Sequence, residues 1–306
     1  MHLPYIGANY NAVYPFRTSV LFTDSLPLAA LFFKLLGGIL PTRFQYFGWW
    51  GLLCYALQGG LAQAVIARIA GVQPTFGRDD KSKAAVAIIM SPGQTDKLWG
   101  SVLGAGVLVL FPALTIRMFA HTALAANWLV LLALYLWLRS DELMPTTRRA
   151  CLIWGGMGLL CAGIHLYYLP MVGLVLVGYA VRRALQKRGF AAEILPVAAF
   201  CVTALAELFL LGAFAVNFAG YSNGYLSGAD YFGLFVPWLA QSWEQNVYAG
   251  IGTSLAVVLA VFGIVCNARK AEKFFAAHRD WLIAGAVVLV LDLIAAGGNT
   301  VTVAGH

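Results

Sequence analysis

Two cationic side chains suited to phosphate binding stand four residues apart in the run F-P-A-L-T-I-R-M-F-A-H-T. A helix over this run would carry Arg117 and His121 on one face, because side chains four apart are neighbours on a helix. Arginine offers phosphate a planar fork of donors, and histidine adds a donor that titrates near neutral pH. His165, near the end of another apolar run, is a third candidate. The alternative is a snorkelling arginine with structural histidines.

A carboxylate stands in F-T-D-S, directly before a short apolar run. Asp24 is a candidate catalytic residue, yet aspartate is also a common N-cap that needs no further function. Two other acids, Glu207 and Asp292, fall inside apolar runs, where an ionisable group is by default a functional candidate. Either acid would suit a proton path. Alternatively Glu207 is neutral and hydrogen-bonded, and Asp292 lies nearer the membrane surface.

A third group of polar residues fills a long segment without Lys or Arg, residues 216–246, together with the Tyr248 that follows it. The segment is rich in Tyr, Trp, Asn, Ser and Gly, and Asp230 and Glu244 are its only charges. Aromatic faces together with amide, hydroxyl and carboxylate groups suit sugar binding. Individual Trp and Tyr residues are equally typical of an interfacial belt.

The elements that must position these groups are transmembrane helices. Of the 306 residues, 61% are hydrophobic and 11% are charged, which is too apolar for a soluble domain. Lipid offers no partners to backbone amides, and the continuous apolar runs lack the alternation of barrel strands. The sequence therefore predicts an all-α, polytopic transmembrane helical bundle of about eight spans.

The predicted architecture is one transmembrane domain over residues 1–306. It consists of an outer loop and interfacial helix (1–45), a helical bundle (46–296) and an outer loop (216–246) inserted in that bundle. The interfacial helix is expected over Ser25–Leu40, which is short and carries Lys34 in its middle. The expected spans are Tyr46–Ala70, Trp99–Thr115, Thr122–Leu138, Ala150–Leu166, Tyr168–Leu185, Ile194–Ala215, Val247–Cys266 and Trp281–Ala296.

The distribution of basic residues predicts the orientation. Cytoplasmic loops carry the excess of Lys and Arg, and with these spans every basic residue except Arg17, Lys34, Arg43 and Arg117 falls on one side. Both termini of the chain, and the candidate residues above other than Glu207 and Asp292, are then extracytoplasmic. The net charge of +7 is explained by this topology, so no nucleic-acid partner is expected. The expected partner is the lipid bilayer.

Several runs resemble an uncharacterised bacterial family of polytopic membrane proteins that is similar to the GT-C glycosyltransferases. They are Y-P-F-R-T-S-V-L-F-T-D-S-L-P-L-A-A-L-F-F-K-L-L, F-Q-Y-F-G-W-W-G-L-L-C, R-M-F-A-H-T-A-L-A-A-N-W-L and E-Q-N-V-Y-A-G-I-G-T-S-L. The resemblance implies a GT-C-like bundle in the bacterial inner membrane. The implied enzyme transfers sugar from a polyprenyl-phosphate donor to an extracytoplasmic acceptor.

The resemblance also implies roles for the candidate residues. Asp24 matches the catalytic base of the first outer loop, and Arg117, His121 and His165 would hold the donor phosphate. Asp230, Glu244 and Tyr248 would position the acceptor. A divalent metal is compatible with this chemistry, but no motif in the sequence indicates one. Such proteins normally begin with a further span and a longer acidic loop, so the chain is expected to be a fragment.

Two other functions remain open at this point. A transporter or flippase of a lipid-linked saccharide would use the same outer cations together with Glu207 and Asp292. A non-catalytic membrane protein of envelope assembly would need none of these groups.

Overall fold

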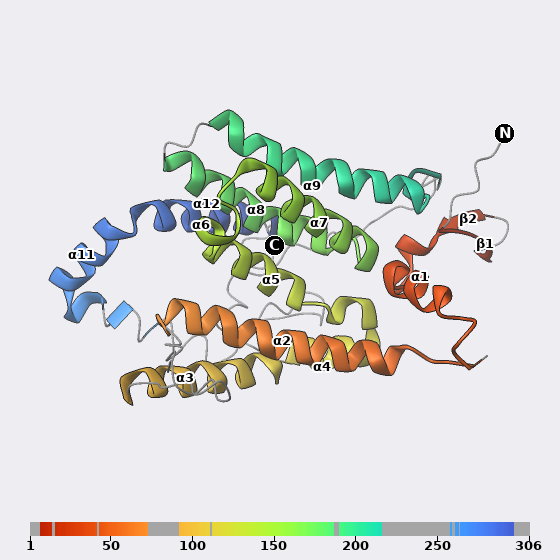
Figure 1. Cartoon of the computed structure of the whole chain (residues 1–306), viewed down its shortest axis with the longest axis horizontal. Helices are drawn as coiled ribbons and strands as arrows, with labels where there is room; N and C mark the ends of the chain where they lie inside the picture. The colour runs from red at the N-terminus through yellow and green to blue at the C-terminus, as the bar shows by residue number, and fades with distance from the viewer. Residues whose placement is uncertain are drawn as a thin grey trace, which may run out of the picture. The chain divides into compact units, whose positions relative to one another are not determined.

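The computed structural model describes residues 7–13, 16–41, 43–72, 92–110, 112–186, 190–215, 258, 261–262 and 264–296 (Figure 1). These residues are mostly helical, with one short hairpin of two strands. Contacts between Cα atoms divide the chain into two compact units, Met1–Leu176 with Ala191–Asn217 and Val177–Phe190 with Phe218–His306. Each unit is described by itself. The single domain expected from the sequence stays a prediction.

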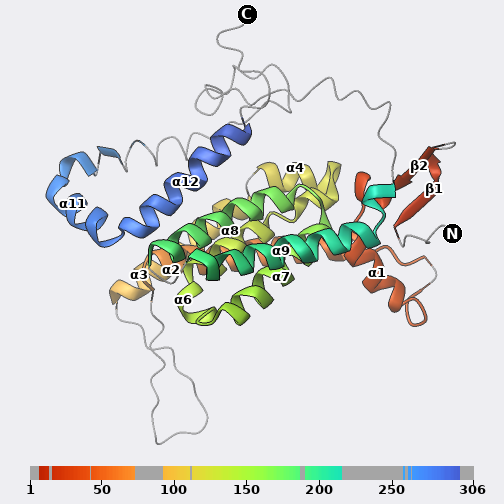
Figure 2. The same cartoon turned by 90° about the horizontal axis from the view of Figure 1, so that it is seen from above.

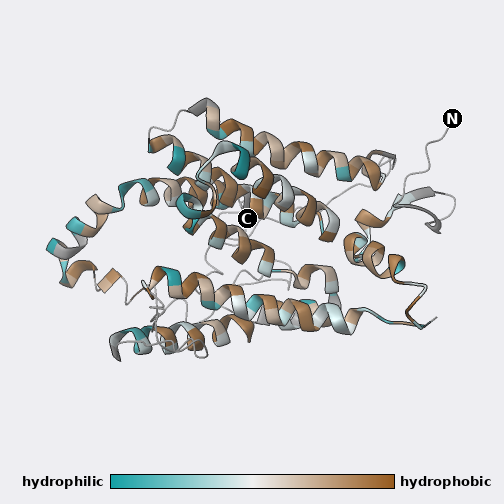
Figure 3. Cartoon of the chain, viewed as in Figure 1, coloured by the Kyte–Doolittle hydropathy of each residue, from teal (hydrophilic) through white to brown (hydrophobic). Residues whose placement is uncertain are grey.

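Three helices among the described residues are long and apolar enough to cross a membrane. These stretches are Phe47–Ile69, Tyr168–Leu185 and Ala192–Leu210. At 1.5 Å per residue the first is about 34 Å long, more than the roughly 30 Å of a hydrocarbon core. Their hydropathy is visible in Figure 3, where α9 is drawn mostly in brown and tan. The predicted helical class is confirmed, whereas the count of eight spans stays a prediction.

The first unit holds the hairpin and most of the helices. The strands are β1 (Ala8–Val13) and β2 (Phe16–Ser19), and the short 3-10 helices are η1 (Val20–Phe22), η2 (Thr122–Ala125) and η3 (Ala213–Ala215). The helices are α1 (Pro27–Leu35), α2 (Phe47–Ile69), α3 (Pro92–Val109), α4 (Pro112–Ala120), α5 (Trp128–Leu138), α6 (Ser140–Leu143), α7 (Thr147–Ile164), α8 (Tyr168–Leu185) and α9 (Phe190–Leu210). Helices α2 and α3 run side by side, and α2 also packs on α5.

Glycine ends the longest helix by adopting a left-handed backbone. Gly71, at φ 68°, follows α2 and donates its N–H to the Arg68 carbonyl over 3.2 Å. The next amide, that of Val72, donates to the Ala67 carbonyl over 2.9 Å. This pair of bonds is a Schellman motif, in which glycine avoids the steric cost that a Cβ would add.

Two of the expected spans are interrupted in the structure. The span expected over Trp99–Thr115 is divided between α3, which ends at Val109, and α4, which begins at Pro112. Proline has no amide hydrogen and clashes with the preceding turn, so it is favoured at the start of a helix and disfavoured inside one. The run Thr122–Leu138 is divided likewise into η2 and α5. Each of the remaining expected spans is mainly helical where the structure describes it, but two of them end early. Helix α7 stops at Ile164, before the predicted Leu166, and α9 stops at Leu210, before the predicted Ala215.

Helices α7 and α9 approach closely because glycines line their contact. The Thr203 hydroxyl of α9 donates to the Gly155 carbonyl of α7 over 2.8 Å. A Cβ at Gly158 would lie 2.5 Å from the Phe200 carbonyl oxygen. Small residues of this kind let helix backbones approach each other without steric conflict.

The second unit contains the end of α8 with α11 (Ala268–Ala277) and α12 (Arg279–Ala296). An ion pair joins α8 to α12 through Arg182 Nε and Asp280 Oδ2, 3.1 Å apart. The guanidinium of Arg182 also lies over the ring of Trp281, 3.8 Å from its centroid. These contacts fix the first turn of α12 against the last turns of α8.

Candidate functional site

The N-terminal hairpin is anchored to the end of α9, and this anchor places Asp24. The Ser19 hydroxyl donates to the Leu211 carbonyl over 2.7 Å and accepts the Leu21 amide of η1 over 3.2 Å. Figure 2 shows β1 and β2 beside this end of α9. A Cβ at Gly7 would lie 2.5 Å from the same Leu211 carbonyl oxygen, so the close approach depends on glycine there. The chain then passes through η1 to Asp24.

Asp24 reaches across to η2 and does not cap the helix that follows it. The N-cap of α1 is Leu26, which makes no side-chain cap, and Pro27 occupies the first helical position. Asp24 Oδ1 instead accepts the Ala123 amide over 3.2 Å. Asp24 is therefore not the N-cap of α1. Its carboxylate instead binds a backbone amide ninety-nine residues further along the chain.

Three side chains from separate elements hold successive backbone groups of η2. Trp50 Nε1 of α2 donates to the Thr122 carbonyl over 3.0 Å, and Asp24 accepts the Ala123 amide. The Tyr168 hydroxyl, from the first turn of α8, donates to the Leu124 carbonyl over 2.7 Å. Three partly buried hydrogen bonds to successive backbone groups fix a segment in one position. The residue before η2, His121, is therefore held at a defined place.

Asp24 and His121 face each other at the surface of the unit. Asp24 Oδ2 lies 3.9 Å from His121 Nδ1, and their side chains are 35% and 44% exposed. This separation is longer than a hydrogen bond but short enough for an ion pair when the imidazole is protonated. Both groups are accessible to a ligand.

His165 joins this pair from the turn between α7 and α8. Burial lowers the pKa of His165, while the carboxylate of Asp24 raises that pKa and His121 lowers it further. All three side chains are therefore within electrostatic range of one another. His165 Nδ1 accepts the Tyr167 amide over 3.3 Å, which places the proton of a neutral ring on Nε2. That N–H is a donor for an anionic ligand.

Arg117 lies one helical turn before His121, as the spacing predicted. The His121 amide donates to the Arg117 carbonyl over 2.8 Å, closing the last turn of α4. The surrounding segment is a helix of nine residues, not the short turn expected between two spans. The half-buried Arg117 interacts electrostatically with the Tyr168 hydroxyl, so its positive charge is directed toward the same region.

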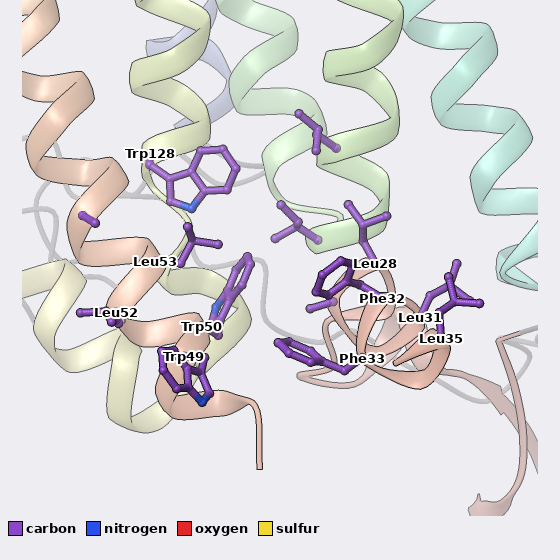
Figure 4. Close-up of a pocket in the computed structure, with 14 residues that line it drawn as sticks. Leu28, Leu31, Phe32, Phe33, Leu35, Trp49, Trp50, Leu52, Leu53 and Trp128 are labelled. Carbon is purple, nitrogen blue, oxygen red and sulfur yellow. The ribbon is translucent and has the colours of Figure 1, made fainter. Parts of the chain in front are cut away.

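An apolar groove of about 780 Å³ lies between α1 and α2. Figure 4 shows Phe33 of α1 directed toward Trp49 and Trp50 of α2, with Leu53 and Trp128 deeper in the groove. Three residues that line the groove are close in the chain to the polar groups or bonded near them. Leu28 follows Asp24 by four residues, and Ile164 directly precedes His165. Trp50 donates to the carbonyl of Thr122, the residue after His121. The apolar groove therefore shares three short segments of the chain with the polar cluster.

The structure thus brings together Asp24, His121 and His165, with Arg117 close by. The remaining three predicted site residues, Asp230, Glu244 and Tyr248, lie outside the described residues. Within the part of the chain that the structure describes, no three His, Cys, Asp or Glu side chains form a metal-binding group. Sequence reasoning missed Trp50 and Tyr168. Their signal was a polar aromatic at the start of an apolar run, which the interfacial belt also explains.

Comparison with known proteins gives one match. The model of the family described as Domain of unknown function (DUF6311) matches residues 1–306. No curated protein and no solved structure matches the chain.

Proposed function

The chain belongs to the family described as Domain of unknown function (DUF6311), and we propose, on its polar cluster and its apolar groove, that it is a membrane glycosyltransferase of the GT-C type. The proposed enzyme takes a sugar from a polyprenyl-phosphate donor and transfers it to an extracytoplasmic acceptor. It is a multi-pass protein of the bacterial inner membrane with both termini of this chain outside. Its fold is a GT-C-like bundle of about eight spans.

The observation that carries the proposal is an apolar groove lined by chain neighbours of Asp24 and His165, together with the cluster that these two residues form with His121. A polyprenyl phosphate is an apolar chain with an anionic head, and the groove with its cations offers both kinds of surface. A pocket of this volume is in the range that binds organic ligands. Arg117, His121 and His165 are proposed to hold the phosphate as charge-assisted donors.

The proposed reaction is a single inverting displacement. Oδ2 of Asp24 takes the proton of the acceptor hydroxyl as that oxygen bonds to the anomeric carbon, and the bond from this carbon to the phosphate oxygen breaks. The nearby cations stabilise the charge that develops on the leaving phosphate. Oδ1 of Asp24 is held by the Ala123 amide, which supports a fixed orientation of the carboxylate. Asp230, Glu244 and Tyr248 remain the proposed acceptor-binding residues.

The decisive experiment replaces Asp24 by Asn in the purified full chain. Sugar transfer from a synthetic polyprenyl-phosphate sugar should fall by about 10²- to 10⁴-fold, the usual contribution of a general base. Donor affinity should change little. The matched control is Asp96→Asn, which neutralises an exposed acid in the first turns of α3, and it should keep full activity. Normal turnover of the Asp24 variant would exclude the proposed base.

A second experiment tests the phosphate clamp. Replacing Arg117 by Gln should weaken binding of the phosphorylated lipid much more than binding of the unphosphorylated polyprenol. The comparison removes any effect on the groove, because both lipids present the same chain. Equal losses of affinity for the two lipids would show that Arg117 does not contact phosphate.

One observation favours the second candidate, a transporter or flippase of a lipid-linked saccharide. Glu207 lies inside the candidate span Ala192–Leu210, and its Oε2 is buried with no hydrogen-bond partner among the described residues. Its other oxygen is directed toward Gly163, beside Leu28 of the groove. An unpaired carboxyl group inside a membrane span costs free energy, so a residue of this kind is by default a functional candidate. Under transport, Glu207→Gln would abolish lipid translocation, whereas a transferase would retain sugar transfer in this variant.

A further inference from the structure

Helix α11 of the second unit has one charged face and one aromatic face. At 100° per residue, Phe274 and Phe275 point to the side of the helix opposite Arg269 and Lys273. Both phenylalanines are exposed, at 54% and 39%. Figure 3 shows several teal turns in α11, in contrast to the apolar α9. This pattern is typical of helices that lie in the plane of a membrane surface.

The corner between α11 and α12 lies beside the end of a candidate span. Asp280 Oδ2 accepts from Arg182 Nε and from Gln186 Nε2, each over 3.1 Å. Arg182 and Gln186 flank Leu185, the last residue of the candidate span Tyr168–Leu185. Helix α11 ends and α12 begins at this corner, so the end of α11 lies level with the end of the candidate span, where apolar residues are followed by polar ones. If α8 spans the bilayer, that depth corresponds to the lipid headgroup region.

The charge of this segment specifies the lipid. Residues 268–280 hold the basic Arg269, Lys270, Lys273 and Arg279 and two acids, Glu272 and Asp280, of which Asp280 pairs with Arg182. The side chains of Arg269, Lys273 and Arg279 are exposed. We propose that α11 lies flat on the bilayer, with Phe274 and Phe275 at the acyl-chain boundary and its basic residues on anionic phospholipid headgroups. This proposal is independent of the transferase reaction.

The test uses amide hydrogen exchange of the full chain in nanodiscs of phosphatidylcholine, with and without phosphatidylglycerol. Amides of 268–277 should exchange more slowly when the anionic lipid is present, and high salt should remove the difference. The Arg269→Gln/Lys273→Gln variant should lose about 30-fold of this protection. That factor corresponds to about 2 kcal/mol, at about 1 kcal/mol for each basic residue near an anionic surface.

Two controls make the result interpretable. Glu272→Gln removes the acid from the same helix and should keep or increase the protection by anionic lipid. Exchange within 282–292 of α12 should be the same in all variants, which shows that the fold is intact. Equal exchange of 268–277 in both lipid mixtures would overturn the proposal. Protection that appears only when an acidic protein is added would also overturn it, in favour of a protein partner.

Discussion

The contact between α7 and α9 gives the sharpest structural prediction, because two glycines of one helix meet opposite surroundings. A Cβ at Gly158 would lie 2.5 Å from the Phe200 carbonyl oxygen and 2.6 Å from the Thr203 hydroxyl. A Cβ at Gly156 would meet nothing within 4 Å. Replacement by alanine should therefore force α7 and α9 apart at the first position and disturb nothing at the second.

The magnitude follows from the comparison of the two variants. Each gains about 1 kcal/mol of helix propensity, so this contribution cancels between Gly158→Ala and Gly156→Ala. The remaining difference is the cost of overpacking, about 1 to 3 kcal/mol. The upper part of this range is expected, because Phe200 contributes a backbone oxygen, which cannot rotate away as a side chain can.

Thermal unfolding of both variants in one detergent measures this difference. At about 2 to 4 °C per kcal/mol for a unit of this size, a cost of about 2 kcal/mol or more should make Gly158→Ala melt at least about 4 °C below Gly156→Ala. Equal melting temperatures would show that the two helices do not approach as closely as the structure indicates.

Two further predictions concern pH. Burial lowers the pKa of His165, so the unfolded chain binds a proton at this residue more readily than the folded chain does. Thermal stability should therefore fall as pH drops below about 6.5. The melting temperature should depend less on pH between about pH 5 and 8 in His165→Gln than in the unmodified chain, and parallel profiles would contradict this reasoning. The hydrogen bond from Arg139, with the charge of Arg68, lowers the pKa of Glu142. The contribution of the Glu142 carboxylate to folding stability is therefore present above about pH 4.3 and is lost as pH falls through the pKa of the folded state. Because this pair is largely exposed, Glu142→Gln should cost no more than about 1 kcal/mol at pH 7, and a larger loss would show a buried role.

The sequence predicted individual helices well where apolar length alone defines them. The span expected over Tyr168–Leu185 coincides with α8. The prediction was less accurate at Pro112 and around Ala126, where apolar composition continues but the backbone changes course. It also missed the β1–β2 hairpin, because strands this short give a weak alternation signal beside strong helical runs.

The candidate site was predictable in part. The spacing of Arg117 and His121 is local, so a helical turn was enough to relate them. The approach of Asp24 to His121 was not predictable, because it depends on the anchor between Ser19 and the carbonyl of Leu211. No pattern in the sequence links those two positions.

Composition and apolar length determined the helical class of this protein, since residues this hydrophobic favour helices wherever backbone amides lack water. The charge and type of individual residues also identified the side chains that are candidates for a functional site. Only the tertiary structure decided that Asp24 binds η2 instead of capping α1, that Asp24 faces His121, and that an apolar groove forms between α1 and α2. The reason is physical: helix propensity and burial are local preferences, whereas a site is made by long-range hydrogen bonds and packing that join segments far apart in the chain.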